Sequence, residues 1–362
     1  MDGGIAVIGA GGFVGARLLE MAVLGGRTDV VPVVRAVRSM GRIAQLGLAY
    51  RVGDAGRPDS LASAIAGCEV VVNLTKGDAR EILSTTENVH AAAVAAGARL
   101  LVHLSSAAVY GAAFPADLPD DAPPLPGHWM PYAREKGRAE NFLRTRMGDP
   151  SLSIVVLRPM LIWGPGSPYV LGTATSLIDG SAWLVGDGSG ICGLMYVDNL
   201  VRAIEAVAAH PAPSSAFFHV GDDETTTWSE YYAALASGLC VDPSTIHRLP
   251  AGAYRPRVGD LLDGVRGSDA YRWLKDRVPL ETRAGLKLRI ARARSRGATS
   301  GRTVKSSPAV TRELWNLQTI RHRLPTGRFA ATFPATSTTS FSAGMASSLT
   351  WLRFIGIGDA AA

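Results

Sequence analysis

Tyr132 and Lys136 are the residues whose types and spacing are best suited to acid–base chemistry. Side chains four positions apart lie on the same face of a helix, so the phenol and the ammonium group would be neighbours. A free tyrosine has a pKa of about 10, which is too high for a base at neutral pH, and a nearby cation favours the phenolate. Such pairs also occur on solvated helix faces, so a second feature is needed before the pair indicates a catalytic site.

Two serines supply that feature. Ser105 and Ser106 directly follow an apolar run at residues 100–104 that is typical of a buried strand. Because the carboxyl ends of parallel strands open onto a ligand crevice, a serine here can hydrogen-bond a substrate oxygen beside the tyrosine hydroxyl. We therefore expect Tyr132 to handle a substrate hydroxyl or carbonyl group, with Lys136 and a serine as helpers.

A glycine-rich turn at residues 9–15 follows the first apolar run, and a helix is predicted to begin at about Phe13. Its glycines permit a tight turn, let backbone amides approach a pyrophosphate and bring the helix against the strand. A turn without a ligand is the alternative, but the position between a strand and a helix favours a dinucleotide. The cofactor-binding residues expected here are Gly9, Gly11, Gly12, Phe13, Val14 and Gly15.

The end of the second predicted strand indicates which dinucleotide is bound. Arg35 stands where an NAD-binding protein usually offers an acid to the ribose hydroxyls, and Arg38 is close behind. A guanidinium suits a 2′-phosphate, so NADP(H) is favoured over NAD(H), although Arg35 could instead stack on adenine or face solvent. Asp54 could accept a hydrogen bond from the adenine amino group or be a turn residue. Leu74 is also expected to contact the cofactor.

Short apolar runs alternate with helical segments, which predicts an α/β fold of the Rossmann type, a doubly wound parallel sheet. Helices are expected from Thr86 to Gly97 and from Tyr132 to about Met147. The expected strands are Ile5–Ile8, Val30–Val34, Ala49–Val52, Val70–Leu74, Leu100–Leu104 and Ile154–Leu157, with a return to the sheet around Phe217–Val220.

The spacing of turn residues predicts two lobes. Residues 1–160, with a return of the chain near 190–222, should form the dinucleotide-binding domain. Residues 161–189 and 223–362 should form a smaller substrate-binding lobe, which includes a basic insert at 282–307.

The basic insert accounts for the net charge of +6. It holds eight basic residues and no acidic residue between positions 283 and 305, so the rest of the chain is slightly acidic. The global charge therefore gives no reason to expect a nucleic-acid partner. Residues 282–296 could form a basic helix that touches anionic lipid or a phosphorylated substrate, or an extended solvated insert.

The composition also indicates where in the cell the protein is located and whether its cysteines form a metal site or disulfides. The longest apolar stretches fall far short of a membrane span, and the first strand begins too near Met1 to leave room for a signal peptide. A cytoplasmic location is therefore expected. Cys68, Cys192 and Cys240 have no metal-like spacing, so neither a metal site nor a disulfide framework is expected.

In combination, these motifs resemble the extended short-chain dehydrogenase/reductases, the family that contains nucleotide-sugar epimerases and 3β-hydroxysteroid dehydrogenases. The resemblance covers residues 8 to about 199. It rests on the glycine-rich turn, Val52-Gly53-Asp54, Leu104-Ser105-Ser106-Ala107-Ala108-Val109-Tyr110-Gly111, Tyr132 with Lys136, Leu157-Arg158-Pro159 and Tyr196-Val197-Asp198-Asn199-Leu200.

The resemblance implies roles for particular residues. The family's catalytic serine lies five residues before the glycine of the Val-Tyr-Gly turn, which selects Ser106 over Ser105. Tyr132 would be the acid/base, Lys136 would bind the nicotinamide ribose and Pro159 would lie near the nicotinamide. Asp198 would be structural. The family also implies a homodimer through the helices at residues 86–96 and 132–147.

A departure from the family pattern restricts the reaction. Sugar dehydratases of this family carry an acidic pair after the catalytic serine or threonine, whereas this chain carries Ala107 and Ala108, which cannot transfer protons. We therefore expect an epimerase or a ketoreductase that acts on a nucleotide sugar. The alternatives are a hydroxysteroid- or β-keto-lipid-type dehydrogenase and, less favoured, a non-enzymatic cofactor-binding regulator.

Overall fold

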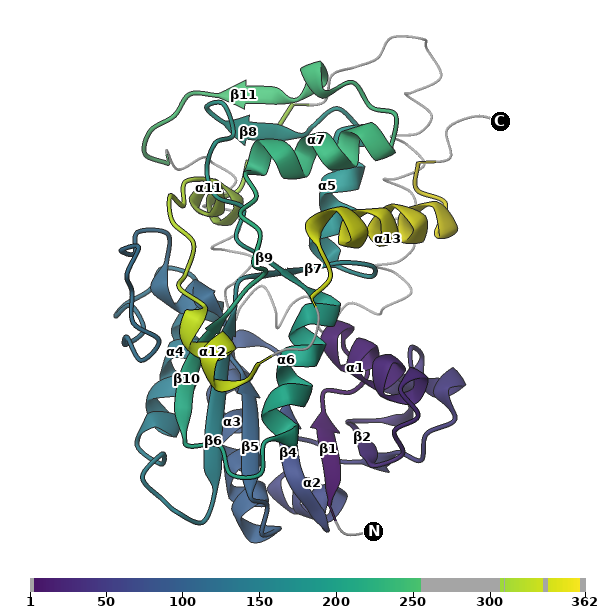
Figure 1. Cartoon of the computed structure of the whole chain (residues 1–362), viewed down its shortest axis with the longest axis vertical. Coiled ribbons are helices and arrows are strands. Elements are labelled where there is room, and N and C mark those ends of the chain that lie inside the picture. The colour runs from purple at the N-terminus through teal and green to yellow at the C-terminus, as the bar shows by residue number, and fades with distance from the viewer. Residues whose placement is uncertain (1–2, 255–306, 309, 335–337, 359–362) are drawn as a thin grey trace, which may run out of the picture.

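A seven-stranded sheet forms the lower half of the structure (Figure 1). The structure is a computed structural model that describes residues 3–254, 307–308, 310–334 and 338–358. Every paired strand of this sheet is parallel to its neighbour, which confirms the predicted Rossmann-type α/β fold. In spatial order the strands are β10 (Ala216–Val220), β6 (Ser153–Pro159), β5 (Leu100–Leu104), β4 (Cys68–Asn73), β1 (Gly4–Ile8), β2 (Val30–Val34) and β3 (Arg51–Val52).

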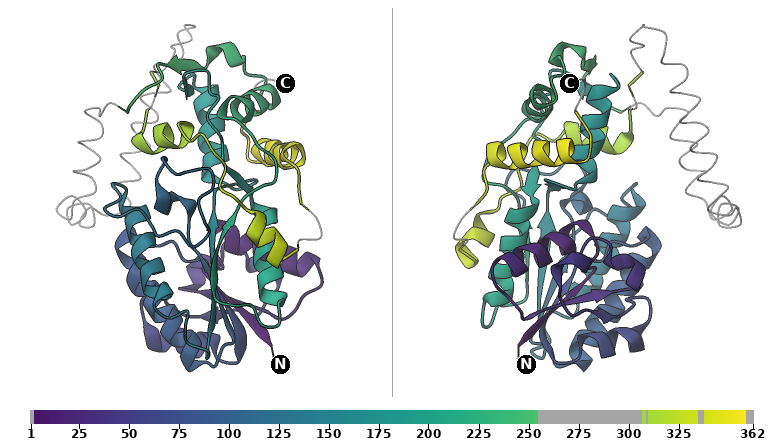
Figure 2. Two further views of the ribbon diagram at one scale, coloured as in Figure 1. Left: turned by 60° about the vertical axis from the view of Figure 1, so that its left-hand side comes forward. Right: turned by 90° about the vertical axis from the view of Figure 1, so that its right-hand side faces the viewer.

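Helices cover both faces of the sheet, as the two views of Figure 2 show. The strands are rich in valine, leucine and isoleucine because side chains on both faces of a parallel sheet are buried. One face packs against α1 (Phe13–Leu24) and α6 (Val197–Ala209). The other face packs against α2 (Pro58–Ile65), α3 (Ile82–Ala95) and α4 (Pro131–Arg144).

The strand order places a crevice at the carboxyl end of β1. The chain leaves β1 toward β2 and β3 on one side, and β4, β5, β6 and β10 follow on the other. The connections on the two sides therefore diverge between β1 and β4. Ligands of open α/β sheets bind at such a switch point, so the strand order alone predicts where a ligand crevice lies.

Several predicted boundaries move by a few residues. The helix expected from Thr86 begins one turn earlier, at Ile82, because Ile82 is buried and extends the inner face. The helix expected to reach Met147 ends at Arg144, and the third strand is shorter than expected. The sixth strand extends through Pro159, which was expected to follow it.

A second group of elements lies above the carboxyl end of the sheet (Figure 1). Its core is rich in aromatic side chains, among them Trp163, Trp228, Tyr231 and Tyr232. The elements are β7 (Leu161–Trp163), α5 (Pro168–Ile178), β8 (Trp183–Val185), β9 (Leu194–Tyr196), α7 (Trp228–Gly238), β11 (His247–Leu249), α11 (Arg312–Gln318) and α13 (Phe341–Phe354). The helix α12 (Gly327–Thr332) instead packs Phe329 against Phe218 of β10.

Short 3₁₀ helices occupy several connections. They are η1 (Val37–Met40), η2 (Ala44–Leu46), η3 (Ala79–Glu81), η4 (Ala107–Tyr110) and η5 (Pro243–Thr245). The predicted basic segment 282–296 and most of the predicted insert lie outside the described residues. Of the helices that the structure describes, none has both the length and the apolar composition of a membrane-spanning segment.

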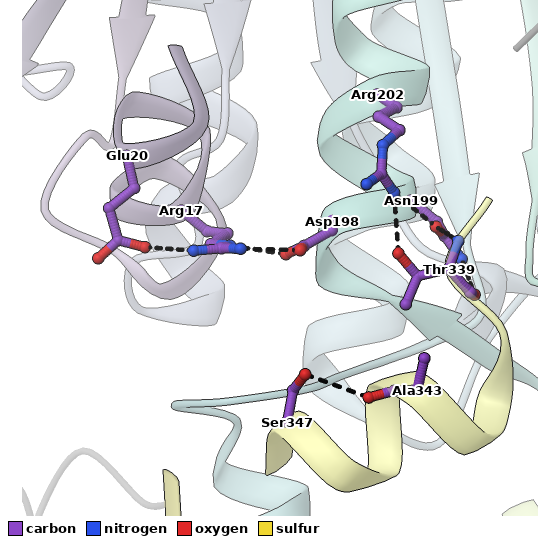
Figure 3. Close-up of polar contacts among 8 residues, drawn as sticks. All are labelled: Arg17, Glu20, Asp198, Asn199, Arg202, Thr339, Ala343 and Ser347. Carbon is purple, nitrogen blue, oxygen red and sulfur yellow. Dashed lines mark hydrogen bonds and ion pairs between the residues drawn. The ribbon is translucent and has the colours of Figure 1, made fainter. Parts of the chain in front are cut away.

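Charged side chains join the cofactor helix α1 to α6 (Figure 3). The guanidinium of Arg17 donates to both carboxylate oxygens of Asp198, at 2.6 and 2.8 Å, and also pairs with Glu20. The hydrogen bond to Asp198 is the main cause of the raised pKa of Arg17. Asp198 therefore ties two helices together, in keeping with the structural role that the family resemblance implies.

The next residue of α6 continues this connection toward the C-terminal helix. Asn199 exchanges hydrogen bonds with the backbone of Thr339, and Arg202 donates to the Thr339 hydroxyl at 3.1 Å (Figure 3). Thr339 lies two residues before α13, so the start of α6 holds together the glycine-loop helix and the upper group of elements.

Candidate functional site

A large cavity of about 1530 Å³ opens at the carboxyl ends of β1, β4 and β5. Its wall runs from the glycine-rich turn to α11 in the upper group of elements. The described residues that we predicted to bind the cofactor or to act in catalysis all line it, with the exception of Arg38. They are Gly9, Gly11, Gly12, Phe13, Val14, Gly15, Arg35, Asp54, Leu74, Ser106, Tyr132, Lys136 and Pro159. The side chain of Arg38 lies outside the described part of the structure.

The glycine-rich turn can accept no larger side chains at two positions. A Cβ atom on Gly15 would lie 2.4 Å from the carbonyl oxygen of Gly9, and one on Gly11 would lie 2.2 Å from that of Ser39. Gly9 itself has a φ of +86°, a left-handed conformation that favours glycine. The turn therefore brings bare backbone to the cavity at the start of α1, where unpaired amide groups favour an anion. These features fit a dinucleotide pyrophosphate.

Two basic side chains that follow β2 also line the cavity. Arg35 and Arg42 both line the cavity, are exposed, and form no ion pair within the described residues. Arg42 was not predicted, since it follows the second strand by eight residues and belongs to no motif. Asp54 lines the same region, and its carboxylate accepts the backbone amide of Gly56 at 3.0 Å. Asp54 is thus a turn residue with its side chain at the cavity wall.

Tyr132, Lys136 and Ser106 come together beside the end of β5. Ser106 directly precedes η4, where its hydroxyl accepts the amide of Ala108 at 3.2 Å, and its interaction with the Tyr132 hydroxyl acts to lower the pKa of that phenol. The ammonium group of Lys136 donates to the carbonyl oxygen of Leu104 at 2.7 Å. Ala107 and Ala108 line the wall next to Ser106, so this stretch carries no side chain that could transfer a proton.

The pKa of Tyr132 differs from the one expected for a tyrosine beside a cation. Burial raises the pKa of Tyr132 to about 12, and the hydrogen bond with Ser106 only partly offsets it. The expected lowering by the neighbouring cation is therefore wrong for the protein without cofactor, because Lys136 is turned toward the backbone of Leu104. Burial lowers the pKa of Lys136 to about 8. At neutral pH Tyr132 is thus a protonated phenol, a form suited to donating a proton.

A buried polar network lies next to the three residues Tyr132, Lys136 and Ser106. Ser105 donates to the carboxylate of Glu140, and Arg158 meets the same carboxylate at 3.0 and 2.6 Å. Arg158 also donates to the hydroxyl of Tyr110, which contacts His219 at 2.8 Å. The hydroxyl of Ser105 is therefore already engaged, whereas that of Ser106 lies next to Tyr132.

The upper end of the cavity is mainly apolar. Phe114, Trp129 and Tyr169 contribute aromatic surface, together with Leu161, Ile162, Leu317 and Ile320. Among the described lining residues after Leu104 in the chain, Lys136 and His128 are the basic side chains and Glu313 is the one acidic side chain. Glu313 accepts a hydrogen bond from the hydroxyl of Tyr169 at 3.0 Å.

Sequence reasoning missed several residues of the wall. Thr75 and Lys76 follow the predicted Leu74 directly, so their place after a strand end was a usable signal. Glu313 and Leu317 lie in α11, far from any motif in the chain, and nothing in the sequence connects them to the site.

The low pKa of Lys136 leads to a prediction about stability. Because this pKa falls from the usual 10.5 to about 8, keeping the charged form buried costs about 3 kcal/mol below pH 8. Between pH 8 and 10.5 the unfolded chain holds a proton that the folded chain has lost, so stability rises with pH and the cost disappears. Lys136→Met should therefore raise the free energy of unfolding by about 1 to 3 kcal/mol at pH 7, after the lost hydrogen bond is subtracted.

Urea unfolding at pH 7 and pH 10 measures this effect. The gain should shrink at pH 10. Arg134→Met on the exposed side of α4 is the matched control and should change stability by less than about 0.5 kcal/mol. A Lys136→Met protein that is less stable than the original at pH 7 would show that the buried ammonium is not destabilising.

Comparisons with known proteins agree with this geometry. The model of the NAD dependent epimerase/dehydratase family matches residues 5–221. A 2-alkyl-3-oxoalkanoate reductase of Stenotrophomonas maltophilia is 32% identical over 252 residues, which cover 65% of this chain and 75% of the relative. The N-acetyl-alpha-D-glucosaminyl-diphospho-ditrans,octacis-undecaprenol 4-epimerase of Escherichia coli O157:H7 is 26% identical over 283 residues, or 74% of this chain and 82% of the relative.

Solved structures show the same fold. One is the UDP-glucuronic acid 4-epimerase from Bacillus cereus in complex with UDP-glucuronic acid and NAD, which is 15% identical with a TM-score of 0.66. The superposition covers 97% of this chain and 99% of that chain. The glycine-rich turn and the crevice at the switch point thus belong to a fold that binds NAD in that relative.

Proposed function

Because the chain belongs to the NAD dependent epimerase/dehydratase family, we propose that it is a ketoreductase that acts on a small substrate with a largely apolar body. Membership of the family makes it an NAD-dependent oxidoreductase or epimerase. The observation that carries the finer proposal is the apolar upper end of the cavity. No arginine lines the described part of that end, and the nearby Arg312 is stacked over the Trp129 ring at 4.4 Å, whereas bidentate guanidinium groups are the usual partners of a sugar-linked diphosphate.

The residues at the site then have distinct tasks. When bound, the nicotinamide cofactor supplies the hydride. Tyr132, protonated at neutral pH, donates its phenolic proton to the carbonyl oxygen of the substrate. Ser106 hydrogen-bonds the same oxygen and positions it. Lys136, held at the carbonyl of Leu104, is placed to bind the nicotinamide ribose. With alanines at positions 107 and 108, elimination of water is disfavoured.

A nucleotide sugar is the second candidate substrate, with epimerisation or keto-sugar reduction as the reaction. It is supported by the Escherichia coli relative, whose name describes a 4-epimerase of a diphosphate-linked sugar. An epimerase regenerates its cofactor in each turnover, whereas a reductase consumes it. The first candidate is supported by the Stenotrophomonas maltophilia relative, whose name describes reduction of 3-oxoalkanoates.

We further propose NADP(H) as the preferred cofactor. Arg35 and Arg42 lie at the cavity end where the 2′-phosphate of the adenosine ribose would be, and neither has an anionic partner among the described residues.

The proposed lobes, 1–160 with 190–222 and 161–189 with 223–362, assign cofactor and substrate to separate parts of the chain. A cytoplasmic homodimer through α3 and α4, and a membrane contact through residues 282–296, stay predictions.

Tyr132→Phe tests the proton donor. The change removes one hydroxyl and should lower kcat by about 100-fold or more, since general acid catalysis contributes a factor of that order. Binding of NADPH, followed by its fluorescence, should change little. Tyr169→Phe removes a phenol hydroxyl from the same cavity and should lower kcat by less than about tenfold. Retention of the original kcat by Tyr132→Phe would contradict the proposal.

Arg35→Asp tests the cofactor preference. A carboxylate repels a 2′-phosphate and can accept hydrogen bonds from ribose hydroxyls, so the ratio of kcat/KM for NADPH to that for NADH should fall by at least about tenfold. Arg42→Gln should lower the same ratio less, because the repulsion is absent. An unchanged ratio in both variants would show that these arginines do not contact the phosphate.

A further inference from the structure

Lys76 is a cation that the proposed mechanism does not use. It follows Thr75 in the loop after β4 and lines the cavity. Its ammonium nitrogen lies 5.3 Å from the centre of the Tyr132 ring. The side chain is exposed and forms no hydrogen bond or ion pair with any residue that the structure describes. An unpaired ammonium group beside the proton donor is available to a ligand.

The nearby carboxylates are engaged elsewhere or do not reach Lys76. Glu140 is held by Arg158, and Glu313 accepts from Tyr169. Glu81, in the same loop as Lys76, lines the cavity but makes no ion pair with it. Lys76 instead acts on Lys136. It lowers the pKa of Lys136, and this contribution is smaller than that of burial. The two ammonium groups repel each other, so an anion bound between them would be stabilised.

The contact with the Tyr132 ring is the observation that favours the substrate side of the cavity for Lys76. The glycine-rich turn offers its amides to the pyrophosphate at the start of α1, and Arg35 and Arg42 lie at the adenosine end. Lys76 lies over the ring whose hydroxyl faces the reacting oxygen. A group that pairs with Lys76 is therefore attached close to the carbonyl carbon.

We infer that Lys76 is the counterion of a carboxylate that the substrate carries within two bonds of its reacting carbonyl carbon. This inference rests on the proposed ketoreductase function and makes the substrate a 2-oxo or 3-oxo acid. The carboxylate meets Lys76, the carbonyl oxygen meets Tyr132 and Ser106, and an alkyl or aryl tail occupies the apolar end near Phe114 and Trp129. Lys76 supplies the cation for this carboxylate, while Lys136 donates to the carbonyl oxygen of Leu104.

The reduction leaves the carboxylate unchanged. The carbonyl carbon gains a hydride from the reduced nicotinamide cofactor, and the carbonyl oxygen gains the proton of Tyr132, so the ketone becomes a secondary alcohol. Tyr132 recovers its proton from solvent. Lys76 takes no part in the proton transfer and acts as a specificity-determining residue.

The test compares acids with neutral analogues in the full-length protein. The substrates are 3-oxodecanoate, 2-oxodecanoate and methyl 3-oxodecanoate, each with NADPH. Lys76→Met should lower kcat/KM for the preferred oxo acid by about 10- to 100-fold, mostly through KM, because a charge-assisted contact is lost. The methyl ester should change by less than about threefold. Lys76→Arg keeps the charge and should restore most of the loss.

Three results would overturn the inference, and the first two concern Lys76→Met. One is an equal loss for acid and ester in Lys76→Met. The other is a raised dissociation constant for NADPH with no change in KM for the acid, which would place Lys76 on the cofactor. If the original protein reduces the ester as efficiently as the acids, the ketoreductase function stands and the role of Lys76 fails.

A binding measurement keeps the inference testable if no ketone is reduced. Decanoate and methyl decanoate are titrated into the protein by calorimetry. Decanoate should bind more tightly than its ester to the original protein, and the difference should disappear in Lys76→Met. Equal affinity for both ligands in the original protein would show that no carboxylate site exists, independently of the reaction.

Discussion

Arg158 and Glu140 form a fully buried ion pair in which the guanidinium meets both carboxylate oxygens, at 3.0 and 2.6 Å. Burying two charges is costly unless their remaining hydrogen-bonding positions are filled. Here Ser105 donates to the carboxylate, and Arg158 donates further to Tyr110 and to the carbonyl oxygen of Asp120 at 2.6 Å. The pair therefore joins α4, the ends of β5 and β6, and the loop before α4 into one unit.

This unit sets the orientation of α4. Tyr132, Lys136 and Glu140 are spaced four residues apart on α4, so they share one face. When Glu140 is fixed to Arg158 of β6, rotation of α4 about its axis is prevented, and the other two side chains must face the end of β5. Ser105 is bound to the same carboxylate, which places the adjacent Ser106 at the cavity wall. The distances among the proposed catalytic groups thus depend on an interaction outside the cavity.

The site illustrates a conflict between function and stability. Lys136 is almost completely buried, and its ammonium group donates to two backbone carbonyl oxygens, that of Leu104 at 2.7 Å and that of Thr75 at 3.5 Å. Its lowered pKa means that the charged form destabilises the fold. A methionine would pack at this position without that cost, so the fold alone gives no reason for a lysine here. Binding of a group beside Lys136, such as the nicotinamide ribose, would give a reason for a lysine at this position.

The fold and the cofactor turn could be predicted because their signals are local. Runs such as residues 30–34 and 100–104 are apolar on both faces, and the glycines at 9, 11 and 15 stand where a Cβ atom would collide or strain the backbone. Arg42, Lys76 and Glu313 have no such signal, since they reach the cavity only through the folding of distant loops and of α11. The pKa of Tyr132 was misjudged because sequence spacing places Lys136 on the same face but does not show that its ammonium group turns to Leu104.

The central claim is that Tyr132 delivers a proton in a net reduction of a carbonyl group. The stoichiometry of NADPH oxidised to alcohol formed, measured by absorbance and by mass spectrometry of the product in the same reaction, tests it most directly. We expect one NADPH to be consumed for each alcohol formed. A substrate converted to an isomer without net consumption of NADPH would contradict it and would identify the protein as an epimerase.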